Sequence, residues 1–240
     1  RQRQMCIRDR LTVAALGDAS SQGAKDAGIA EENIIHLDTS RGMQQIMAER
    51  RTAPEVEIDP DEDLAVLPYS SGTTGLPKGV RLLHRQLVAN VQQGQDIELL
   101  RRDDTVYAVL PFFHIYGLTA LVNLALAQRC TLVVAPRFEL QSFLEHHEKF
   151  QVNFTLIAPP IAVQLAKHPM VDNYDLSRMR AVFSGAATLD EDLAVALEER
   201  LGIHVQQGYG LTETSPLVHA NVSKDINRGS VSYTHLRAHE

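Results

Sequence analysis

The sequence predicts an α/β protein in which mostly parallel sheets are flanked by helices. Short apolar runs of strand length recur along the chain, and stretches with apolar residues at helical spacing lie between them. This alternation is typical of α/β units built around a mostly parallel sheet. Strands are expected within the apolar runs 64–69, 105–111, 130–136, 153–160, 180–187 and 203–207.

Helices are expected between these strands. In the last of them, Thr188 can cap the first turn while Glu191 reaches back to the cap, and Gly202 can take the left-handed turn that ends it. Ahead of the first helix, residues 11–37 indicate strand, loop and strand, and the acidic stretch 55–64 indicates a linker. The expected helical ranges are 84–100, 117–128, 140–150, 160–168 and 188–201.

Composition excludes several classes of function. The net charge of −7 argues against sequence-independent nucleic-acid binding, which depends on clustered lysine and arginine. No apolar run reaches the roughly 18 residues that a membrane span needs. The two cysteines, Cys6 and Cys130, show neither metal-ligand spacing nor a disulfide framework, so a cytoplasmic location is expected.

The two ends differ in character from the rest of the chain. Residues 1–10 are rich in arginine without apolar periodicity, and residues 231–240 break off within a pattern. Both resemble translated sequencing-adapter read-through, so we expect a non-native leader and a non-native tail. The rest is expected to form the end of a first subdomain with its linker, 11–58, and a larger subdomain, 59–230.

A run of small hydroxyl residues and glycines, YSSGTTGLPKGV, occupies residues 69–80. Glycine lets backbone N–H groups approach an anion closely because no Cβ blocks the way. Serine and threonine hydroxyls add neutral donors, and Lys78 adds the positive charge that phosphate oxygens attract. The Walker A pattern does not fit, because Leu76 and Pro77 separate Gly75 from Lys78. The run therefore predicts a different phosphate-binding loop; a solvated turn without a ligand is the alternative.

Three further stretches follow in order: LPFFHIYGL (110–118), SGAATL (184–189) and QGYGLTET (207–214). Together with the loop they resemble the signature motifs of the adenylate-forming superfamily, which includes acyl- and aryl-CoA synthetases, firefly luciferase and peptide-synthetase adenylation domains. The resemblance covers about residues 11 to 230 and is nearest to 4-coumarate–CoA ligase and its fatty-acyl relatives. It implies a fragment of the large N-terminal domain of that fold, with the small C-terminal domain absent from this sequence.

The resemblance also implies a reaction. ATP activates a carboxylic acid to an acyl-adenylate, and the thiol of coenzyme A then displaces AMP, with Mg²⁺ as the metal ion. Residues 59–230 would be the ATP- and acid-binding subdomain, of low or no activity alone. A peptide-synthetase-type adenylation domain and a non-catalytic nucleotide-binding fragment are the alternatives.

By the same resemblance, Tyr209 lies near the adenine, Thr212 contacts the α-phosphate and Glu213 holds the magnesium ion, for which a carboxylate is a suitable ligand. The alternatives are that Thr212 and Glu213 only begin another helix and that the SGAA segment only packs closely against its neighbours. The expected nucleotide-binding residues are Ser70, Ser71, Gly72, Thr73, Thr74, Gly75, Lys78, Gly185, Ala186, Ala187, Gln207, Gly208, Tyr209, Gly210 and Thr212.

His114 is the histidine expected to orient the carboxylate of the acid, although a satisfied core histidine is the alternative. His146 and His147 are expected on a solvated helix face and not in a metal site. The expected catalytic residues are Lys78, His114, Thr212 and Glu213, and the expected acid-binding residues are His114, Tyr116, Gly117, Ala158, Pro159, Pro216 and Leu217.

Overall fold

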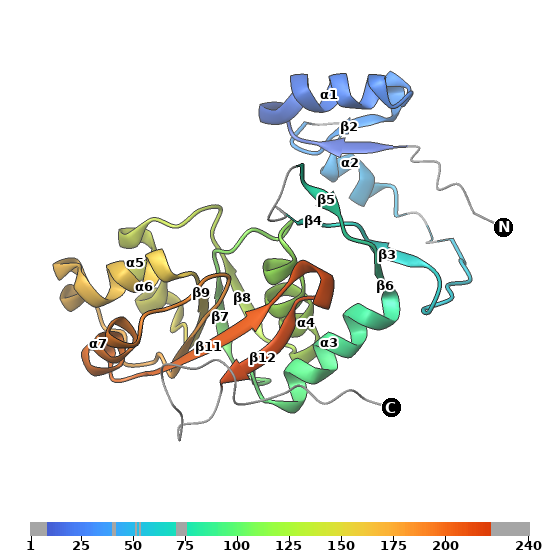
Figure 1. Ribbon diagram of the computed structural model, residues 1–240. Coiled ribbons are helices and arrows are strands. Elements are labelled where there is room, and N and C mark those ends of the chain that lie inside the picture. Colours follow the sequence, from blue (N-terminus) through green and yellow to red (C-terminus); the bar gives the residue numbers. More distant parts are fainter. Residues whose placement is uncertain (1–8, 40–41, 51, 53, 71–75, 222–240) are drawn as a thin grey trace. The chain divides into compact units, whose positions relative to one another are not determined.

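The computed structural model describes residues 9–39, 42–50, 52, 54–70 and 76–221. Contacts divide the chain into a small unit, Arg1–Glu57, and a large unit, Ile58–Glu240 (Figure 1). None of the helices in these described ranges is both long and apolar enough to span a membrane.

The small unit contains a parallel pair of strands, β1 (Arg10–Thr12) and β2 (Ile34–His36). They are connected by the short 3-10 helix η1 (Ala14–Leu16), the helix α1 (Gly17–Asp26) and a second 3-10 helix, η2 (Glu31–Asn33). The helix α2 (Met43–Ala48) follows β2. The two strands expected within 11–37 are therefore confirmed, but the expected loop between them was wrong, because α1 connects the strands. The buried face of α1 consists of the small residues Ser20 and Ala24, so large apolar residues give no helical periodicity there.

The large unit is built on a mostly parallel sheet, which confirms the predicted fold class. The sheet has the order β12-β11-β10-β9-β7-β8, and only the β11–β12 pair is antiparallel. A parallel sheet needs a crossover between successive strands, and helices supply it here. The strands are β7 (Thr105–Ala108), β8 (Thr131–Val134), β9 (Phe154–Ile157), β10 (Ala181–Ser184), β11 (His204–Gly210) and β12 (Leu217–Asn221).

Helices cover both faces of this sheet (Figure 1). Val182 belongs to an apolar cluster with residues of α5, α6 and α7, whereas its neighbour Phe183 belongs to a cluster with Leu121 and Leu124. Successive strand side chains point to opposite faces, so a buried sheet needs both clusters. The elements are α3 (His84–Asp96), η3 (Tyr116–Asn123), α4 (Leu124–Gln128), α5 (Leu140–Phe150), α6 (Pro159–Lys167), η4 (Pro169–Asn173), α7 (Glu191–Leu201) and η5 (Thr212–Thr214).

Two helix predictions need correction. The range 117–128 is not one α-helix, because it begins with the π-helical segment η3, a geometry frequent at functional sites. The last helix, α7, is capped by Asp190 and not by Thr188: the Asp190 carboxylate accepts hydrogen bonds from the backbone of Asp192 and Leu193. The predicted stop at Gly202 is confirmed by its left-handed φ of 64°.

The apolar run 64–69 does not form a strand of the main sheet. Pro68 interrupts the run, and it divides into β3 (Leu64–Val66) and β4 (Tyr69–Ser70). These pair antiparallel with β6 (Leu82–Leu83) and β5 (Lys78–Gly79), respectively. Ser70 stands opposite Lys78, so this hairpin holds the two ends of the predicted phosphate loop together.

At the amino ends of the central strands, a partly buried ion pair joins two of them. Asp104, 3% exposed, precedes β7, and Arg180 precedes β10. The Arg180 Nε donates to Asp104 Oδ1 at 3.0 Å, a second guanidinium nitrogen contacts Oδ2, and the guanidinium lies 4.4 Å from the centroid of the Phe154 ring. The pair is bidentate, which fixes the spacing of β7 and β10 as well as neutralising both charges.

Candidate functional site

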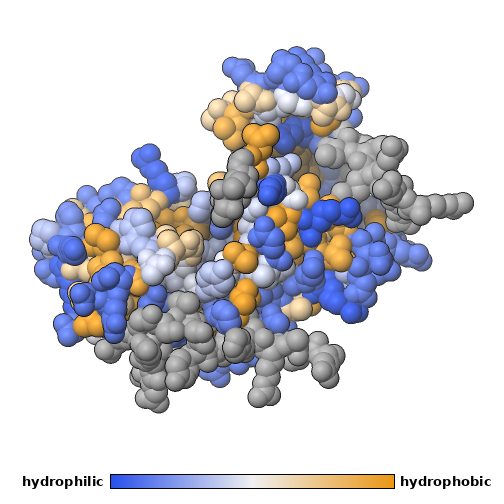
Figure 2. All heavy atoms as spheres, viewed as in Figure 1, coloured by the Kyte–Doolittle hydropathy of each residue, from blue (hydrophilic) through white to orange (hydrophobic). Residues whose placement is uncertain are grey.

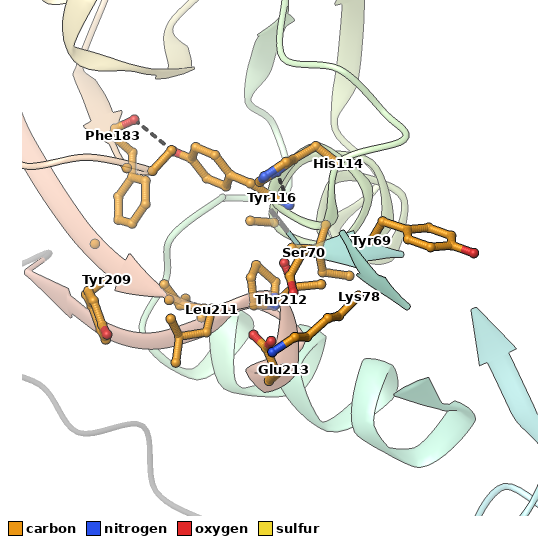
Figure 3. Close-up of a pocket in the computed structure, with 18 residues that line it drawn as sticks. Tyr69, Ser70, Lys78, His114, Tyr116, Phe183, Tyr209, Leu211, Thr212 and Glu213 are labelled. Atoms are coloured by element: carbon orange, nitrogen blue, oxygen red, sulfur yellow. Dashed lines mark hydrogen bonds between the residues drawn. The ribbon is translucent and has the colours of Figure 1, made fainter. Parts of the chain in front are cut away.

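A cavity of about 700 Å³ lies in the large unit, within the size range of small-molecule sites (Figure 3). Its lining comes from segments far apart in sequence: the β4–β5 hairpin, the start of η3, and the ends of β10 and β11 with the turn that follows. The predicted residues that line it are Ser70, Lys78, His114, Tyr116, Gly185, Ala186, Gly208, Tyr209, Gly210, Thr212, Glu213, Pro216 and Leu217.

Other predicted residues do not line the cavity. Gln207 is buried within β11, and Gly117 is buried close to the Pro111 carbonyl. Ala158 and Pro159 form the N-terminal end of α6, and Ala187 is exposed. Ser71, Gly72, Thr73, Thr74 and Gly75 lie outside the described residues.

Sequence reasoning missed several residues that line the cavity. Phe183 directly precedes the SGAA segment, and Ala120 lies four residues after Tyr116, so helical spacing could have found it. The others flank residues that had been identified. The missed residues are Tyr69, Ile115, Ala120, Phe183 and Leu211.

Opposite charges meet at the hairpin side of the cavity. Lys78 and Glu213 both line it and both are exposed. In Figure 3 the ammonium end of Lys78 is directed toward the carboxylate of Glu213, with Ser70 and Thr212 nearby. A cation, a carboxylate and two hydroxyls together suit a ligand that carries phosphates and a metal ion.

His114 is exposed and lines the cavity, so the alternative of a satisfied core histidine is wrong. The backbone N–H of Tyr116 donates a hydrogen bond to Nδ1 of His114 at 3.2 Å (Figure 3). Because Nδ1 acts as an acceptor, the neutral ring carries its proton on Nε2. The imidazole therefore offers one N–H donor, suited to a carboxylate or phosphate oxygen.

Tyr116 and Phe183 form an apolar wall of the cavity. The Tyr116 hydroxyl donates to the Phe183 carbonyl oxygen at 3.2 Å, and the two ring centroids are 6.4 Å apart. Burial raises the pKa of Tyr116 far above its usual range. The phenol therefore remains neutral and contributes shape rather than charge.

The turn after β10 lies tightly against this wall. A Cβ placed at Gly185 would lie 3.0 Å from the Tyr116 hydroxyl, so a larger residue would displace the ring. Ala186 has a φ of 70°, in the left-handed region that disfavours a side chain. Strained backbone of this kind is typical of segments held in place for binding.

Two glycines in β11 permit close contacts on either side of Tyr209. A Cβ at Gly208 would lie 2.2 Å from the Phe183 ring, and one at Gly210 would lie 2.1 Å from the Pro216 carbonyl oxygen. Tyr209 is 48% exposed, and its ring is stacked with that of His219 across the β11–β12 pair, at 6.2 Å between centroids. The ring offers a flat surface at the cavity.

The segment from Leu211 to Leu217 forms a closed turn. The backbone N–H of Leu211 donates to the Pro216 carbonyl oxygen at 3.1 Å, and η5 within this turn is only three residues long. Thr212 and Glu213 therefore do not begin a longer helix, which was the alternative to a binding role. The turn presents both residues to the cavity.

The paired histidines on α5 differ from the prediction. His147 is 2% exposed rather than solvated: its Nδ1 donates to the Phe143 carbonyl at 2.7 Å, and its Nε2 accepts from the Thr155 hydroxyl at 2.7 Å. Burial lowers the pKa of His147 to about 4.

Among the described residues, no group of three or more histidine, cysteine or acidic side chains could hold a metal ion. Among the described residues that line the cavity, only Glu213 has a carboxylate, which fits Mg²⁺ because Mg²⁺ takes its other ligands from phosphates and water.

Comparison with known proteins gives a consistent result. A family model described as AMP-binding enzyme matches residues 5–235. A probable 4-coumarate–CoA ligase of Dictyostelium discoideum is 45% identical over 181 residues, covering 74% of this chain and 33% of the relative. A 4-coumarate–CoA ligase of Solanum tuberosum is 43% identical over 192 residues, covering 78% of this chain and 34% of the relative. The crystal structure of ATP-bound MatB from Rhodopseudomonas palustris matches with a TM-score of 0.77 at 26% identity. The match covers 91% of this chain and 42% of the MatB chain. The chain thus spans about a third of the length of these curated relatives.

Proposed function

Because the chain belongs to the AMP-binding enzyme family, we propose that its cavity is the site at which ATP activates a carboxylic acid to an acyl-adenylate. In the whole protein, the acyl group then passes to coenzyme A. The observation that supports this best is the meeting of Lys78, His114 and Glu213, from three distant segments, around one cavity.

The hairpin side of the cavity would bind the phosphates. Lys78 neutralises charge on the β- and γ-phosphates, and Ser70 offers a neutral hydroxyl donor beside it. The remaining predicted loop residues, 71–75, would add backbone and hydroxyl donors. Uncharged donors suit a loop that must release pyrophosphate after the reaction.

Glu213 would hold Mg²⁺, which when bound neutralises charge on the phosphate oxygens. Thr212 lines the cavity and would contact the α-phosphate through its hydroxyl, and Tyr209 would supply a flat surface for the adenine. The small residues Gly185 and Ala186 leave room for the base.

The first step is a displacement at phosphorus. A carboxylate oxygen of the acid attacks the α-phosphorus; a new O–P bond forms while the bond to pyrophosphate breaks, and its electron pair leaves with pyrophosphate. The Nε2–H of His114 holds the carboxylate in line, and Lys78 stabilises the departing charge. In the second step the sulfur of coenzyme A forms a bond to the acyl carbon while the acyl C–O bond to AMP breaks; its electron pair leaves with AMP, and the thiol proton is released to solvent.

The wall formed by Tyr116, Phe183 and Leu217 suits an aryl or medium-length acyl group. The two curated relatives reported above are described as 4-coumarate–CoA ligases, one of them as probable, which agrees with an aryl or aryl-like acid. The runner-up is a peptide-synthetase-type adenylation domain, which would need a carboxylate for the substrate amine. Among the described residues that line the cavity, Glu213 is the only acidic one and lies on the phosphate side.

We also propose a cytoplasmic location. The argument for it is the cysteine usage of the sequence, which shows no disulfide framework.

Thermal unfolding with non-hydrolysable acyl-sulfamoyl adenosines tests the proposal, because it measures binding by this chain without requiring turnover. The cinnamoyl, medium alkyl, long alkyl and aminoacyl compounds are compared with adenosine and with each free acid. A ligand at a hundredfold excess over its Kd stabilises the folded state by about 2.7 kcal/mol.

We expect the largest rise in Tm with the cinnamoyl or the medium alkyl compound. A preference for the aminoacyl compound would favour the peptide-synthetase alternative. Equal shifts with adenosine and all acyl compounds would favour a nucleotide-binding fragment without an acid site. A cooperative transition that no compound shifts would contradict the proposed binding site.

A further inference from the structure

We propose that Asn90, on helix α3, is a positioning residue that holds Thr212 and Glu213 in place opposite Lys78. This inference rests on the proposed function of the cavity. Asn90 itself is 6% exposed and is not among the residues that line the cavity, so it would act through the backbone that it binds.

The Asn90 side chain makes a two-point contact with the backbone of Leu217. Its Nδ2 donates to the Leu217 carbonyl oxygen at 2.8 Å, and its Oδ1 accepts from the Leu217 N–H at 3.1 Å. Nδ2 also donates to Gln93 Oε1 at 3.1 Å, so both amide hydrogens are used. Together the contacts hold Leu217 through one donor and one acceptor in a fixed geometry.

The position of Leu217 explains why an amide is needed there. Leu217 begins β12, the outer strand of the sheet in the described part of the chain, so one side of its backbone has no neighbouring strand. Leu217 is 7% exposed, and buried backbone N–H and C=O groups that lack partners are costly. Asparagine presents both a donor and an acceptor, as a neighbouring strand would.

This contact joins the two parts of the cavity that carry opposite charges. On one side, α3 directly follows β6, which is separated by only two residues from β5 and Lys78. On the other side, Leu217 closes the turn in which Leu211 N–H binds the Pro216 carbonyl and which contains Thr212 and Glu213. Asn90 therefore fixes this turn to the helix that extends from the hairpin of Lys78.

A purely structural amide would lower stability without a specific effect on the metal-dependent part of binding. Asn153 offers a matched control, because its Oδ1 accepts a hydrogen bond from the Thr105 N–H at 2.9 Å, next to the Asp104–Arg180 ion pair. Both residues are asparagines that bind backbone of a distant segment, but they lie at opposite ends of the sheet.

The experiment measures two quantities for wild type, Asn90→Leu, Asn90→Asp and Asn153→Leu. Urea unfolding gives the free energy of unfolding, and calorimetric titration gives the Kd for ATP with and without Mg²⁺, at a temperature where each variant is folded. Asn90→Leu keeps the branch at Cγ and the number of side-chain heavy atoms but loses both contacts, whereas Asn90→Asp keeps the acceptor and loses the donor. Glu213→Gln, alone and combined with each Asn90 variant, completes a double-mutant cycle.

We expect Asn90→Leu to weaken Mg²⁺-dependent binding of ATP at least tenfold, Asn90→Asp to weaken it less, and Asn153→Leu to lower stability without changing Kd. In the Glu213→Gln background the Asn90 replacements should have little further effect. A wild-type Kd in a folded Asn90 variant, or effects that multiply with those of Glu213→Gln, would overturn the inference. If Asn90→Leu does not fold, Asn90→Asp decides by the same criteria.

Failure of the proposed function gives a different result. In that case wild type itself does not bind ATP, and the inference fails with it. Binding by wild type with unchanged affinity in the Asn90 variants overturns the positioning role alone.

Discussion

Charged side chains are paired with each other at the amino ends of the central sheet, whereas at its carboxyl ends they line a cavity. At the amino ends, Asp104 and Arg180 neutralise each other, and Asp104 is 3% exposed. At the carboxyl ends, His114 and Glu213 are exposed around a cavity that Lys78 also lines. Figure 2 shows one face of the molecule, on which hydrophilic and hydrophobic residues are interspersed, so surface hydropathy alone does not separate the two ends.

This difference teaches where to look for function in such a sheet. A charge that is paired and buried has its interaction partners within the protein, whereas exposed polar groups around a concave site are available to a ligand. Both ends contain charged residues, so charge alone does not identify the site. Burial and pairing do.

The largest expected effect is at the amino ends. Replacement Arg180→Met should lower the free energy of unfolding by about 3–5 kcal/mol, because it leaves the Asp104 carboxylate buried without its partner. Urea unfolding measures this change. Arg178→Met, at an exposed arginine two residues away, is the control and should have little effect. Similar losses in the two variants would remove one side of the comparison.

The buried histidine of α5 should make stability depend on pH. The pKa of His147 is lowered to about 4, so below its ordinary value of about 6.5 the unfolded chain takes up a proton that the folded chain does not. Its contribution therefore lowers the free energy of unfolding as pH falls from 6.5, by about 2 kcal/mol at pH 5.

Urea unfolding between pH 7 and 5 measures this slope. His147→Asn should reduce the slope, because it removes the buried group whose pKa is lowered in the folded state. Equal slopes in wild type and His147→Asn would show that other groups cause the acid sensitivity.

At the carboxyl ends, the expected effects are on binding and not on stability. Lys78→Ala should weaken binding of Mg²⁺ and ATP by about 10- to 100-fold, because a hydrogen bond to a charged group contributes about 1.5–3 kcal/mol. The free energy of unfolding should remain near that of wild type, since Lys78 is exposed. Calorimetric titration measures the affinity, with the exposed Lys167→Ala as control. Equal affinities in the two variants would exclude Lys78 from the phosphate site.

The smallest predicted effect concerns the adenine surface. Tyr209→Leu should weaken ATP binding several-fold, since an aromatic contact contributes about 0.5–1.5 kcal/mol. Binding of inorganic pyrophosphate should not change, because it has no base. A parallel loss for both ligands would mean that Tyr209 supports the site as a whole rather than the base.

Much of this organisation could be predicted from the sequence. Apolar runs with flanking turn residues gave the parallel strands, and motif order brought Lys78, His114 and Glu213 to the same site hypothesis. The prediction failed where tertiary contacts decide: small buried residues concealed α1, and Asp190 replaced Thr188 as the cap of α7. Asn90 and Arg180 could not be identified because their partners, Leu217 and Asp104, are distant in sequence. The subdomain boundary between 58 and 59 stays a prediction.

The central claim is that the carboxyl ends of the sheet bind the ligand while the amino ends serve stability. Hydrogen–deuterium exchange of this chain, with and without the acyl-sulfamoyl adenosine that stabilises it most, tests the claim residue by residue. We expect slower exchange in the ligand complex around 113–117, 185–187 and 208–213, and no specific change around 102–105 and 178–181. Protection centred on the amino ends, or spread equally over both ends, would contradict it.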